Sequence, residues 1–579
     1  MQSLIAPRLG KFYKINIFEE LEMNTLTLLH HRFFLSLITC IFITKLVLAQ
    51  IPETGLVSTP DSIASKIATD ILEQGGNAID AGVAAMFVLS VVQPYAAGIG
   101  GGGLMLIRMN QNSNPIAIDF REQAPQSTDL AIFYQDNETF NMNTKHGYRS
   151  IGVPGMMAGA EKALQLYGTM TLSEILDPAI ETAKHGFEVS EVLANLIIAN
   201  YDLIESNRAT SSIFLPFWLP INKGQTQVRE DLAFTFELLS VHGTKVFYHG
   251  EIAQNICEQL KRNNGLVQLT DFQSYQPLVR QPIKGSYRNL DLVAVPPPSS
   301  GGIALIELLA ILKKFNLKQY KLNNGPYIHI VAEAMKQVFQ DREKYYMGDP
   351  KFDAIKPQSV LSDKHIEKRY HQIDSARVTP VLNQGMSRSN QESRNAAHIS
   401  IVDRNGNTIS ISLTLNNFFG SGVTIPKYGI LLNNAMYNFS RDSSKINSLK
   451  PGKRPQTSLT PTIMLKNNKP FLILGGSGAE KTISMLAQII INIVDFQLSL
   501  NEAVNAPRFH YNYYDDAIEM ETRIEADDIE YLKKLGHKIN LKQDYDVYFG
   551  SAQAVLIDPD NHIYVAVNDV RQEGVVYIK

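Results

Sequence analysis

The hydrophobic positions at the start of the folded part of the chain follow a helical period. Three isoleucines recur four residues apart with small or apolar residues beside them: Ile63, Ile67 and Ile71. This spacing predicts a helix that is buried along one face. Thr59 is a candidate N-cap, Pro60 suits the first helical position, and the pair Gly75-Gly76 should end the helix.

A second helix should begin directly afterwards. Asn77 can cap a segment from Ala78 to about Val92 that is apolar on all sides, as expected of a helix inside the core of a large protein. The run Gly98–Gly103 then leads into a strand-like segment at 104–108. Since this run lacks the Lys-Ser/Thr of a phosphate-binding loop, a tight turn with close backbone approach is favoured over a phosphate cradle.

The last third of the chain changes to a period of two. It begins after a polar stretch at about 374–394 that has the composition of an exposed linker. His398–Val402 and Thr408–Thr414 alternate around an Asn-Gly turn, which predicts a β-hairpin, and a second hairpin is predicted at 552–557 and 563–567. Core helices followed by β-hairpins predict an α/β (α+β) fold with sheets layered between helices.

Composition narrows the function classes. The 579 residues are 44% hydrophobic and 19% charged, as in ordinary globular proteins, and the net charge of −3 gives no electrostatic case for a nucleic-acid partner. The two cysteines, Cys40 and Cys257, have no spacing that suits a metal site or a redox pair. No zinc or nucleotide motif occurs, so neither a metal nor a cofactor is expected.

The N-terminal segment predicts secretion. Phe33–Ala49 is mostly apolar and ends in residues that a signal peptidase accepts, so residues 1–49 are interpreted as a signal peptide, with Met23 as a possible true start. Lys45 and the modest length argue against a stable transmembrane span, although a membrane-anchoring signal stays the alternative. Two N-x-S/T sequons are the expected glycosylation sites and give mild support to an extracellular location: Asn137 and Asn438.

Eight ordered segments resemble the γ-glutamyltransferases, also called γ-glutamyltranspeptidases or glutathione hydrolases. They are Gly76–Ala81, Gly98–Arg108, Asp119–Glu122 with Ala124-Pro125, Val153–Gly155, Pro296–Gly302, Gly429–Asn434, Lys453–Pro455 and Ala506–His510. The resemblance implies an N-terminal-nucleophile hydrolase fold, an αββα sandwich. It also implies a precursor that cuts itself into two subunits, after which a new N-terminal threonine attacks the γ-glutamyl bond of glutathione and similar compounds.

An alanine, Ala396, stands where this family has its threonine. The family has Thr-Thr-His or Thr-Ser-His where this chain has Ala396-Ala397-His398. Alanine carries no hydroxyl that could attack a peptide bond or a substrate. We therefore expect 50–395, the large-subunit-like region, to stay joined to 396–579, the small-subunit-like region.

The resemblance also assigns roles to other positions. The implied substrate-binding residues are Arg121, Thr414, Asn416, Asn438, Thr457, Ser458, Gly478 and Ala479. Arg121 matches the arginine that binds the substrate α-carboxylate, and Thr414 and Asn416 match residues that support the nucleophile. Thr457 and Ser458 retain the hydroxyls of the family's serine pair.

Two parts of the implied site differ from the family. Ala435 and Asn438 replace an amide or acid and the acid that pairs with the substrate ammonium. Gly478-Ala479 replaces the Gly-Gly pair whose N–H groups bind the oxyanion, and these donors are expected to survive only if φ is negative at Ala479.

These replacements favour a secreted pseudoenzyme that is not an enzyme and that binds, at most weakly, a γ-glutamyl or glutamate-like small molecule or a protein partner. Two alternatives stay open. The chain could be an active γ-glutamyl transferase or hydrolase with another nucleophile, such as Ser393 or a bound water. It could also be an interaction protein that pairs with an active paralogue.

Overall fold

The computed structural model describes residues 52, 55–112, 114–134, 144–346, 348–380 and 395–572. The predicted signal peptide, the possible start at Met23, the sequon at Asn137 and the alternative nucleophile Ser393 lie outside these residues. Ile51–Ile557 and Tyr564–Lys579 form one compact unit, to which the sites described below belong, and the turn at 558–563 is assigned to a separate unit.

The first predicted helix is present, but it begins later than its sequence suggests. Helix α2 spans Ser62–Glu73, and its N-cap is Asp61, whose carboxylate accepts hydrogen bonds from the N–H groups of Ile63 (2.8 Å) and Ala64 (3.2 Å). The Thr59 hydroxyl instead donates to the Asp61 carbonyl at 2.8 Å. The prediction of Thr59 as the cap is therefore wrong, because aspartate two residues later is an equally good cap and occupies the position.

The second helix has the predicted bounds and cap. Helix α3 spans Ala78–Val92, and every one of its residues is buried. Asn77 and Asp80 form a capping box, in which each side chain accepts a hydrogen bond from the other residue's backbone. The Asp80 carboxylate also accepts from the N–H of Thr169 at 2.9 Å, which joins this helix to a distant loop.

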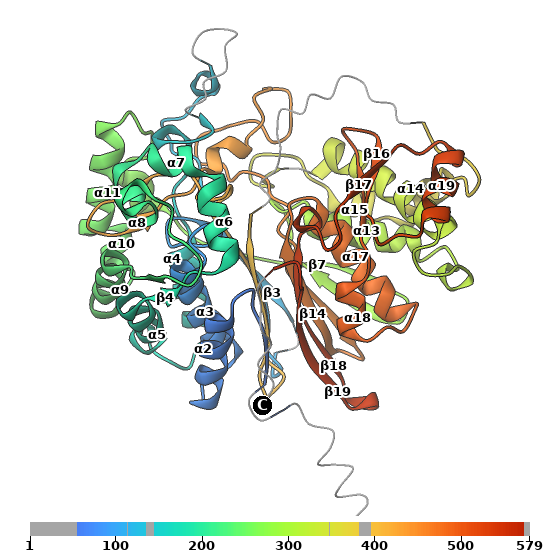
Figure 1. The fold of residues 1–579 in the computed structure, drawn as a ribbon, viewed down its shortest axis with the longest axis horizontal. Helices are drawn as coiled ribbons and strands as arrows, with labels where there is room; N and C mark the ends of the chain where they lie inside the picture. Colours follow the sequence, from blue (N-terminus) through green and yellow to red (C-terminus); the bar gives the residue numbers. More distant parts are fainter. Residues whose placement is uncertain are drawn as a thin grey trace, which may run out of the picture. The chain divides into compact units, whose positions relative to one another are not determined.

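Two six-stranded sheets form the centre of the unit (Figure 1). The first has the order β1 (Leu56–Ser58), β9 (Ala397–Val402), β10 (Thr408–Thr414), β2 (Gly102–Arg108), β3 (Ile116–Phe120) and β6 (Leu278–Arg280). The second has the order β19 (Ile563–Asn568), β18 (Ser551–Asp558), β14 (Lys469–Ser477), β13 (Thr462–Lys466), β8 (Leu290–Ala294) and β7 (Ile283–Tyr287). Both predicted hairpins are confirmed, as β9–β10 and β18–β19.

Helices cover the outer face of each sheet (Figure 1). On the first sheet lie α2, α3, α4 (Met156–Tyr167), α5 (Leu172–His185), α6 (Glu191–Ala199), α7 (Tyr201–Glu205), α8 (Arg208–Phe214), α9 (Glu230–His242), α10 (Lys245–Tyr248), α11 (Glu251–Arg262) and α12 (Leu269–Ser274). On the side of the second sheet lie α13 (Gly301–Leu312), α14 (Gly325–Asp341), α15 (Pro357–Val360), α16 (Asp363–His371), α17 (Lys481–Val494), α18 (Leu500–Asn505) and α19 (Ala526–Leu535). The predicted αββα sandwich is confirmed.

Smaller elements complete the unit. A three-stranded sheet contains β15 (Phe509–Asn512), β16 (Ala517–Glu521) and β17 (Ile539–Lys542), and two-stranded pairs are formed by β4 (Phe187–Glu188) with β5 (Thr226–Gln227) and by β11 (Thr424–Ile425) with β12 (Ile430–Leu431). None of the helices in the described part of the chain combines the length and the hydropathy needed to cross a bilayer.

The polar face of the β9–β10 hairpin packs against the second sheet and not against solvent. The Ser400 hydroxyl donates to the Gln553 carbonyl at 3.1 Å, and the Ser410 hydroxyl donates to the Leu474 carbonyl at 3.4 Å. The His398 ring fills the space beside Gly475, where a Cβ atom would lie 2.2 Å from the ring. The two sheets therefore approach closely at this point, which is next to the pocket described below.

Candidate active site

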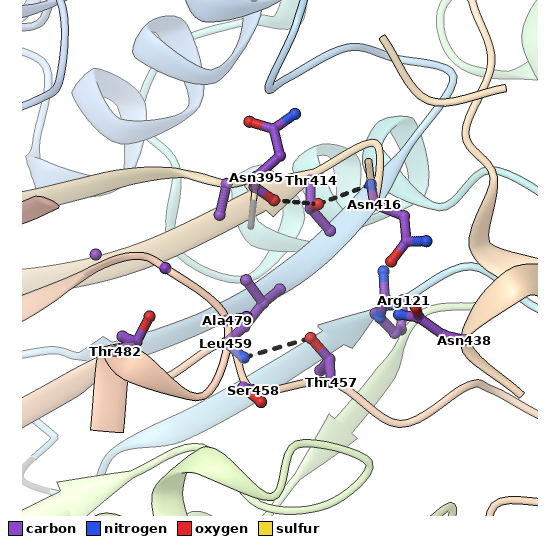
Figure 2. Close-up of a pocket in the computed structure, with 13 residues that line it drawn as sticks. Arg121, Asn395, Thr414, Asn416, Asn438, Thr457, Ser458, Leu459, Ala479 and Thr482 are labelled. Atoms are coloured by element: carbon purple, nitrogen blue, oxygen red, sulfur yellow. Dashed lines mark hydrogen bonds between the residues drawn. The ribbon is translucent and has the colours of Figure 1, made fainter. Parts of the chain in front are cut away.

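One pocket brings together the residues that the sequence assigned to the substrate site (Figure 2). Its lining comprises Arg121, Asn395, Ala396, Thr414, Asn416, Asn438, Thr457, Ser458, Leu459, Gly476, Gly478, Ala479 and Thr482. All eight predicted substrate-binding residues and Ala396 are present in this set, although their chemical roles stay predictions. Four further residues were not anticipated: Asn395, Leu459, Gly476 and Thr482.

Hydrogen bonds hold the peptide before Ala396 at the start of β9, which lies between β1 and β10 in the first sheet. The Thr414 hydroxyl donates to the Asn395 carbonyl at 2.7 Å and accepts from the Asn416 N–H at 2.8 Å (Figure 2). The Asn395 side chain donates to the Tyr95 carbonyl. Ala396 itself is 5% exposed, and its methyl group offers no nucleophile. The supporting contacts expected around a nucleophile are thus in place around a residue that lacks one.

Glycines allow the backbone to approach closely at the end of β10. A Cβ atom at Gly101 would lie 2.4 Å from the Thr414 carbonyl oxygen, and one at Gly100 would lie 2.2 Å from the Leu431 carbonyl oxygen. The glycine run therefore serves close backbone approach, as predicted. It fixes the end of β10 that carries Thr414.

Arg121 provides a buried cationic donor set. The side chain is fully buried, and its Nη1 contacts the Glu122 carboxylate. Its Nε and Nη2 atoms have no hydrogen-bond partner among the described residues. These two N–H groups share one edge of the guanidinium, the edge that binds a carboxylate with two parallel hydrogen bonds. Burial raises the pKa of Glu122, although Arg121 beside it acts in the opposite direction.

The side of the pocket next to Arg121 is polar, but no acid is among its lining residues. Asn438 lies at the end of η7 (Ala435–Asn438), close to Arg121 (Figure 2). Asn416 contributes a buried side-chain oxygen, Oδ1, that has no partner among the described residues, while its Nδ2 donates to the Asn434 carbonyl at 3.1 Å. None of the pocket-lining residues is an aspartate or a glutamate. The side-chain oxygens of Asn416 and Asn438 can therefore accept hydrogen bonds, but none of the pocket-lining residues offers a negative charge to an ammonium group.

A backbone turn between β14 and α17 presents two N–H groups to the pocket. Gly478 has φ 129° and Ala479 has φ 55°, and neither N–H donates a hydrogen bond to another group in the described part of the chain. The φ at Ala479 is therefore positive, not negative as the expected condition for these donors requires. Alanine adopts the left-handed conformation here at a cost of about 1–2 kcal/mol, and the role of the two N–H groups as oxyanion donors stays a prediction. The N-terminus of α17 adds a favourable dipole for an oxyanion.

Hydroxyl groups line the side of the pocket nearest this turn. The Ser458 hydroxyl accepts a hydrogen bond from Arg342 Nη2 at 2.9 Å, and the Thr457 hydroxyl accepts from the Leu459 N–H at 3.3 Å. Thr482, in the first turn of α17, directs its side chain toward the same space (Figure 2). Its place one helical turn after the Gly478-Ala479 turn is the signal that could have identified it.

His398 is not a base for this pocket. It is fully buried in β9, and its ring nitrogens lie 2.8 Å from the Ser412 hydroxyl and 3.1 Å from the Ser400 hydroxyl. Burial lowers the pKa of His398 to about 3. His398 is therefore a packed residue of the strand.

Two buried groups elsewhere have a composition that could hold a metal ion. They are His329 with Glu333 and His537, and Glu307 with Asp341 and His365. Their atoms are already engaged: His329 Nδ1 lies 2.7 Å from His537 Nε2, and Lys336 pairs with Glu333 at 2.7 Å. Arg369 likewise pairs with Asp341. Neither group lies in the pocket, and the expectation of no metal stays a prediction.

Solved structures of similar fold include hydrolases of the expected class. A cephalosporin acylase from Bacillus halodurans is 27% identical, with a TM-score of 0.81 over 90% of this chain and 95% of its own. The γ-glutamyltranspeptidase from Helicobacter pylori is 34% identical, with a TM-score of 0.53 over 57% of this chain and 96% of its own. The N-terminal-nucleophile hydrolase fold is therefore confirmed.

Relatives of known sequence are named as enzymes. The glutathione hydrolase proenzyme of Escherichia coli (strain K12) is 36% identical over 89% of this chain and 90% of its own. Glutathione hydrolase 2 of Arabidopsis thaliana is 32% identical over 79% of this chain and 80% of its own. The prediction that this chain is not an enzyme is wrong, because similarity over most of its length links it to relatives that are named glutathione hydrolases.

The family model described as Gamma-glutamyltranspeptidase matches residues 64–578, nearly the whole described unit. The match spans most of α2, all of α3, every strand of both sheets except β1, and every residue that lines the pocket. The chain belongs to the gamma-glutamyltranspeptidase family.

Proposed function

We propose that the chain is a γ-glutamyl hydrolase or transferase that acts on glutathione or a related γ-glutamyl compound in the pocket of Figure 2. The observation that carries this proposal is the Nε–Nη2 edge of Arg121, which is buried and unpaired among the described residues. A buried cation with two free donors suits the α-carboxylate of a glutamyl group. The names of the relatives, glutathione hydrolases, support the same substrate class.

The nucleophile in this proposal is a water molecule. Its oxygen forms a bond to the γ-carbonyl carbon, the carbon–nitrogen bond breaks, and the departing nitrogen takes a proton from the water. The N–H groups of Gly478 and Ala479 would stabilise the charge on the carbonyl oxygen. The hydroxyls of Thr457 and Thr482 could hold the water. Turnover should be far below that of relatives with a threonine nucleophile, because binding and an oxyanion hole alone supply only about 10³–10⁴-fold over water.

Arg121→Lys should lower the kcat/KM for glutathione hydrolysis by about 30-fold or more. Lysine keeps the charge but cannot form two parallel hydrogen bonds with a carboxylate, and a weakened buried charge pair typically costs about 2–5 kcal/mol. Chromatographic measurement of released glutamate gives the rate. Arg280→Lys is the matched control, because Arg280 pairs with Asp119 and does not line the pocket. Equal rates in the unmodified protein and Arg121→Lys, or no release above buffer, would contradict the proposal.

A second candidate substrate lacks the α-ammonium group. Asn438 and Ala435 leave no carboxylate at the positions that would face the substrate ammonium group. A glutaryl amide, which has no ammonium group, would therefore lose less binding free energy in this pocket than a γ-glutamyl amide. Among the relatives are proteins named acylase, including Acylase ACY 1 proenzyme of Pseudomonas sp. (strain SE83), 32% identical over 84% of this chain and 87% of its own. The observation at Asn438 favours this candidate specifically.

We expect glutaryl-4-nitroanilide to be hydrolysed with a kcat/KM at least equal to that of γ-glutamyl-4-nitroanilide. The physical reason is that the buried site would desolvate the ammonium of the γ-glutamyl compound without giving it a negative partner. Both rates are measured by absorbance on one preparation, so the amount of active protein cancels. A tenfold preference for the γ-glutamyl compound would reject the second candidate and leave the first in place.

We also propose that the signal is removed after Ala49 and that the chain is secreted, which the apolar segment Phe33–Ala49 supports. Contrary to the expectation from its sequon, Asn438 should carry no glycan in the secreted protein, because its side chain lines the pocket and is only 6% exposed. N-terminal sequencing of protein from the medium tests the first statement, and the mass of the Asn438 peptide tests the second. A sugar on Asn438 would require addition before folding and would close the pocket.

A further inference from the structure

A short loop carries the most exposed aromatic side chains of the described residues. The loop comprises η4 (Pro216–Trp218) and Leu219. The exposed fractions of its side chains are 94% for Phe217, 63% for Trp218 and 68% for Leu219. Three consecutive large apolar residues thus face solvent, in a chain whose other large apolar residues are mostly buried. Such a concentration of exposed apolar surface is typical of a contact site.

The backbone of this loop adopts an unfavourable conformation at two of the exposed residues. Phe217 and Trp218 have φ values of 56° and 65°, in the left-handed region that bulky residues rarely adopt. Hydrogen bonds fix the turn: the Trp218 N–H donates to the Leu215 carbonyl at 2.9 Å, and the Leu219 N–H donates to the Pro216 carbonyl at 3.2 Å. Strain retained in this way is associated with recognition sites.

Neighbouring helices anchor and surround the loop. The Tyr201 hydroxyl, at the start of α7, donates to the Trp218 carbonyl at 3.2 Å. Charges of both signs lie close in sequence on the exposed surface: Asp202, Glu205, Arg208 and Lys223. Lys223 is paired with Glu191 at 2.8 Å. The local net charge is therefore small, which gives no preference for an anionic partner.

The size of the patch decides between partners. Phe217, Trp218 and Leu219 together expose on the order of 400 Å². A stable protein–protein interface needs about 800 Å² from each side, with a complementary surface. A bilayer needs neither, because its interfacial region is fluid and accepts a small apolar tip, and tryptophan is enriched at that depth. A balanced set of surrounding charges matches a zwitterionic headgroup layer.

We propose that the Phe217-Trp218-Leu219 loop docks the folded protein reversibly onto a zwitterionic lipid bilayer. The three side chains would enter the interfacial region, with Pro216 and Pro220 at its boundary. This contact differs from an N-terminal membrane anchor, and it does not depend on the function proposed for the pocket.

The intrinsic fluorescence of the protein tests the proposal, because Trp218 is the only tryptophan in the chain. Adding phosphatidylcholine vesicles to the purified secreted protein, which lacks Phe33–Ala49, should shift the Trp218 emission maximum to shorter wavelength and protect it from acrylamide. Vesicles with brominated acyl chains should quench it directly. Co-flotation gives the bound fraction, which should change less than threefold between 50 and 500 mM salt.

Phe217→Ser with Leu219→Ser keeps the reporter and should lower the vesicle-bound fraction at least tenfold, with an unchanged melting temperature. Val241→Ser removes an apolar residue that is 76% exposed at the end of α9 and should leave binding unchanged. The proposal is overturned if the emission does not respond to vesicles at millimolar lipid, or if the double variant still binds. It is also overturned if emission shifts with protein concentration without lipid, which would identify a second copy of the chain as the occupant.

Discussion

Ala396→Thr should split the chain between Asn395 and residue 396 and raise the rate of γ-glutamyl hydrolysis by several orders of magnitude. The Asn395 carbonyl already accepts a hydrogen bond from the Thr414 hydroxyl at 2.7 Å, so it is polarised for attack by a hydroxyl at the next residue. In that attack, the acyl group of Asn395 moves from nitrogen to the hydroxyl oxygen, and water then releases it. The freed α-amine can act as the base for the new nucleophile.

The expected gain follows from what a missing nucleophile costs. Removing the nucleophile of a serine protease lowers kcat by roughly 10⁶-fold, so restoring one here should raise kcat by ~10³–10⁶-fold. Intact-mass analysis should give two fragments for Ala396→Thr. The unmodified protein should give one chain from about Gln50 to Lys579, because Ala396 cannot initiate cleavage. Glutamate release from glutathione measures the rate.

Ala397→Ser is the matched control for this prediction. Successive side chains in a strand point to opposite faces, and Ala397 packs in the core beneath α3 whereas Ala396 lines the pocket. A hydroxyl at 397 should therefore produce neither cleavage nor added activity. If Ala396→Thr also stays a single chain, position 396 is not the nucleophile position that the resemblance implies. Cleavage of the unmodified protein would show that another group supplies the attack.

The sequence predicted the elements whose determinants are local. Helix α3 begins and ends as expected, because the Asn77 cap and an unbroken apolar run are both encoded within it. Helix α2 begins at Ser62 because two good caps, Thr59 and Asp61, compete within three residues. The alternating face of β10 could not be assigned to solvent or to core, since the strands that cover it come from residues after 460.

The pocket shows the same division between local and distant determinants. The ordered motifs gave the positions of Arg121, Thr414 and the Gly478-Ala479 turn, and the structure brings them together. The left-handed conformation of Ala479 could not be read from residue type, because alanine rarely adopts it. The missing nucleophile and the replacements at Ala435, Asn438 and Ala479 led to an expectation of inactivity, yet these positions do not outweigh similarity to enzymes over almost the whole chain.

Ala396→Thr alone should still bind γ-glutamyl substrates poorly, and adding Asn438→Asp with Ala435→Glu should lower KM by about 30- to several-thousandfold. In the proposed function Arg121 binds the carboxylate, but no acid is among the pocket-lining residues that could face the ammonium group. Leaving one charge of a buried pair without its partner costs about 2–5 kcal/mol, and each 1.4 kcal/mol is tenfold in affinity. Steady-state kinetics with γ-glutamyl-4-nitroanilide measures KM and kcat separately.

Tyr437→Asp, added to Ala396→Thr, separates a local ammonium site from a general effect of negative charge. Tyr437 is adjacent to Asn438 in sequence but does not line the pocket, so an acid there should change KM by less than threefold. The variant that combines Ala396→Thr, Asn438→Asp and Ala435→Glu should also hydrolyse glutaryl-4-nitroanilide with a lower kcat/KM. That substrate has no ammonium group, so the introduced carboxylates would stay unpaired when it binds. If Ala396→Thr alone matches a threonine-bearing relative in kcat/KM, the missing acid has no energetic consequence. The substrate would then be held through Arg121 and neutral hydrogen bonds, and the oxygen atoms of Asn416 and Asn438 would suffice for its ammonium group.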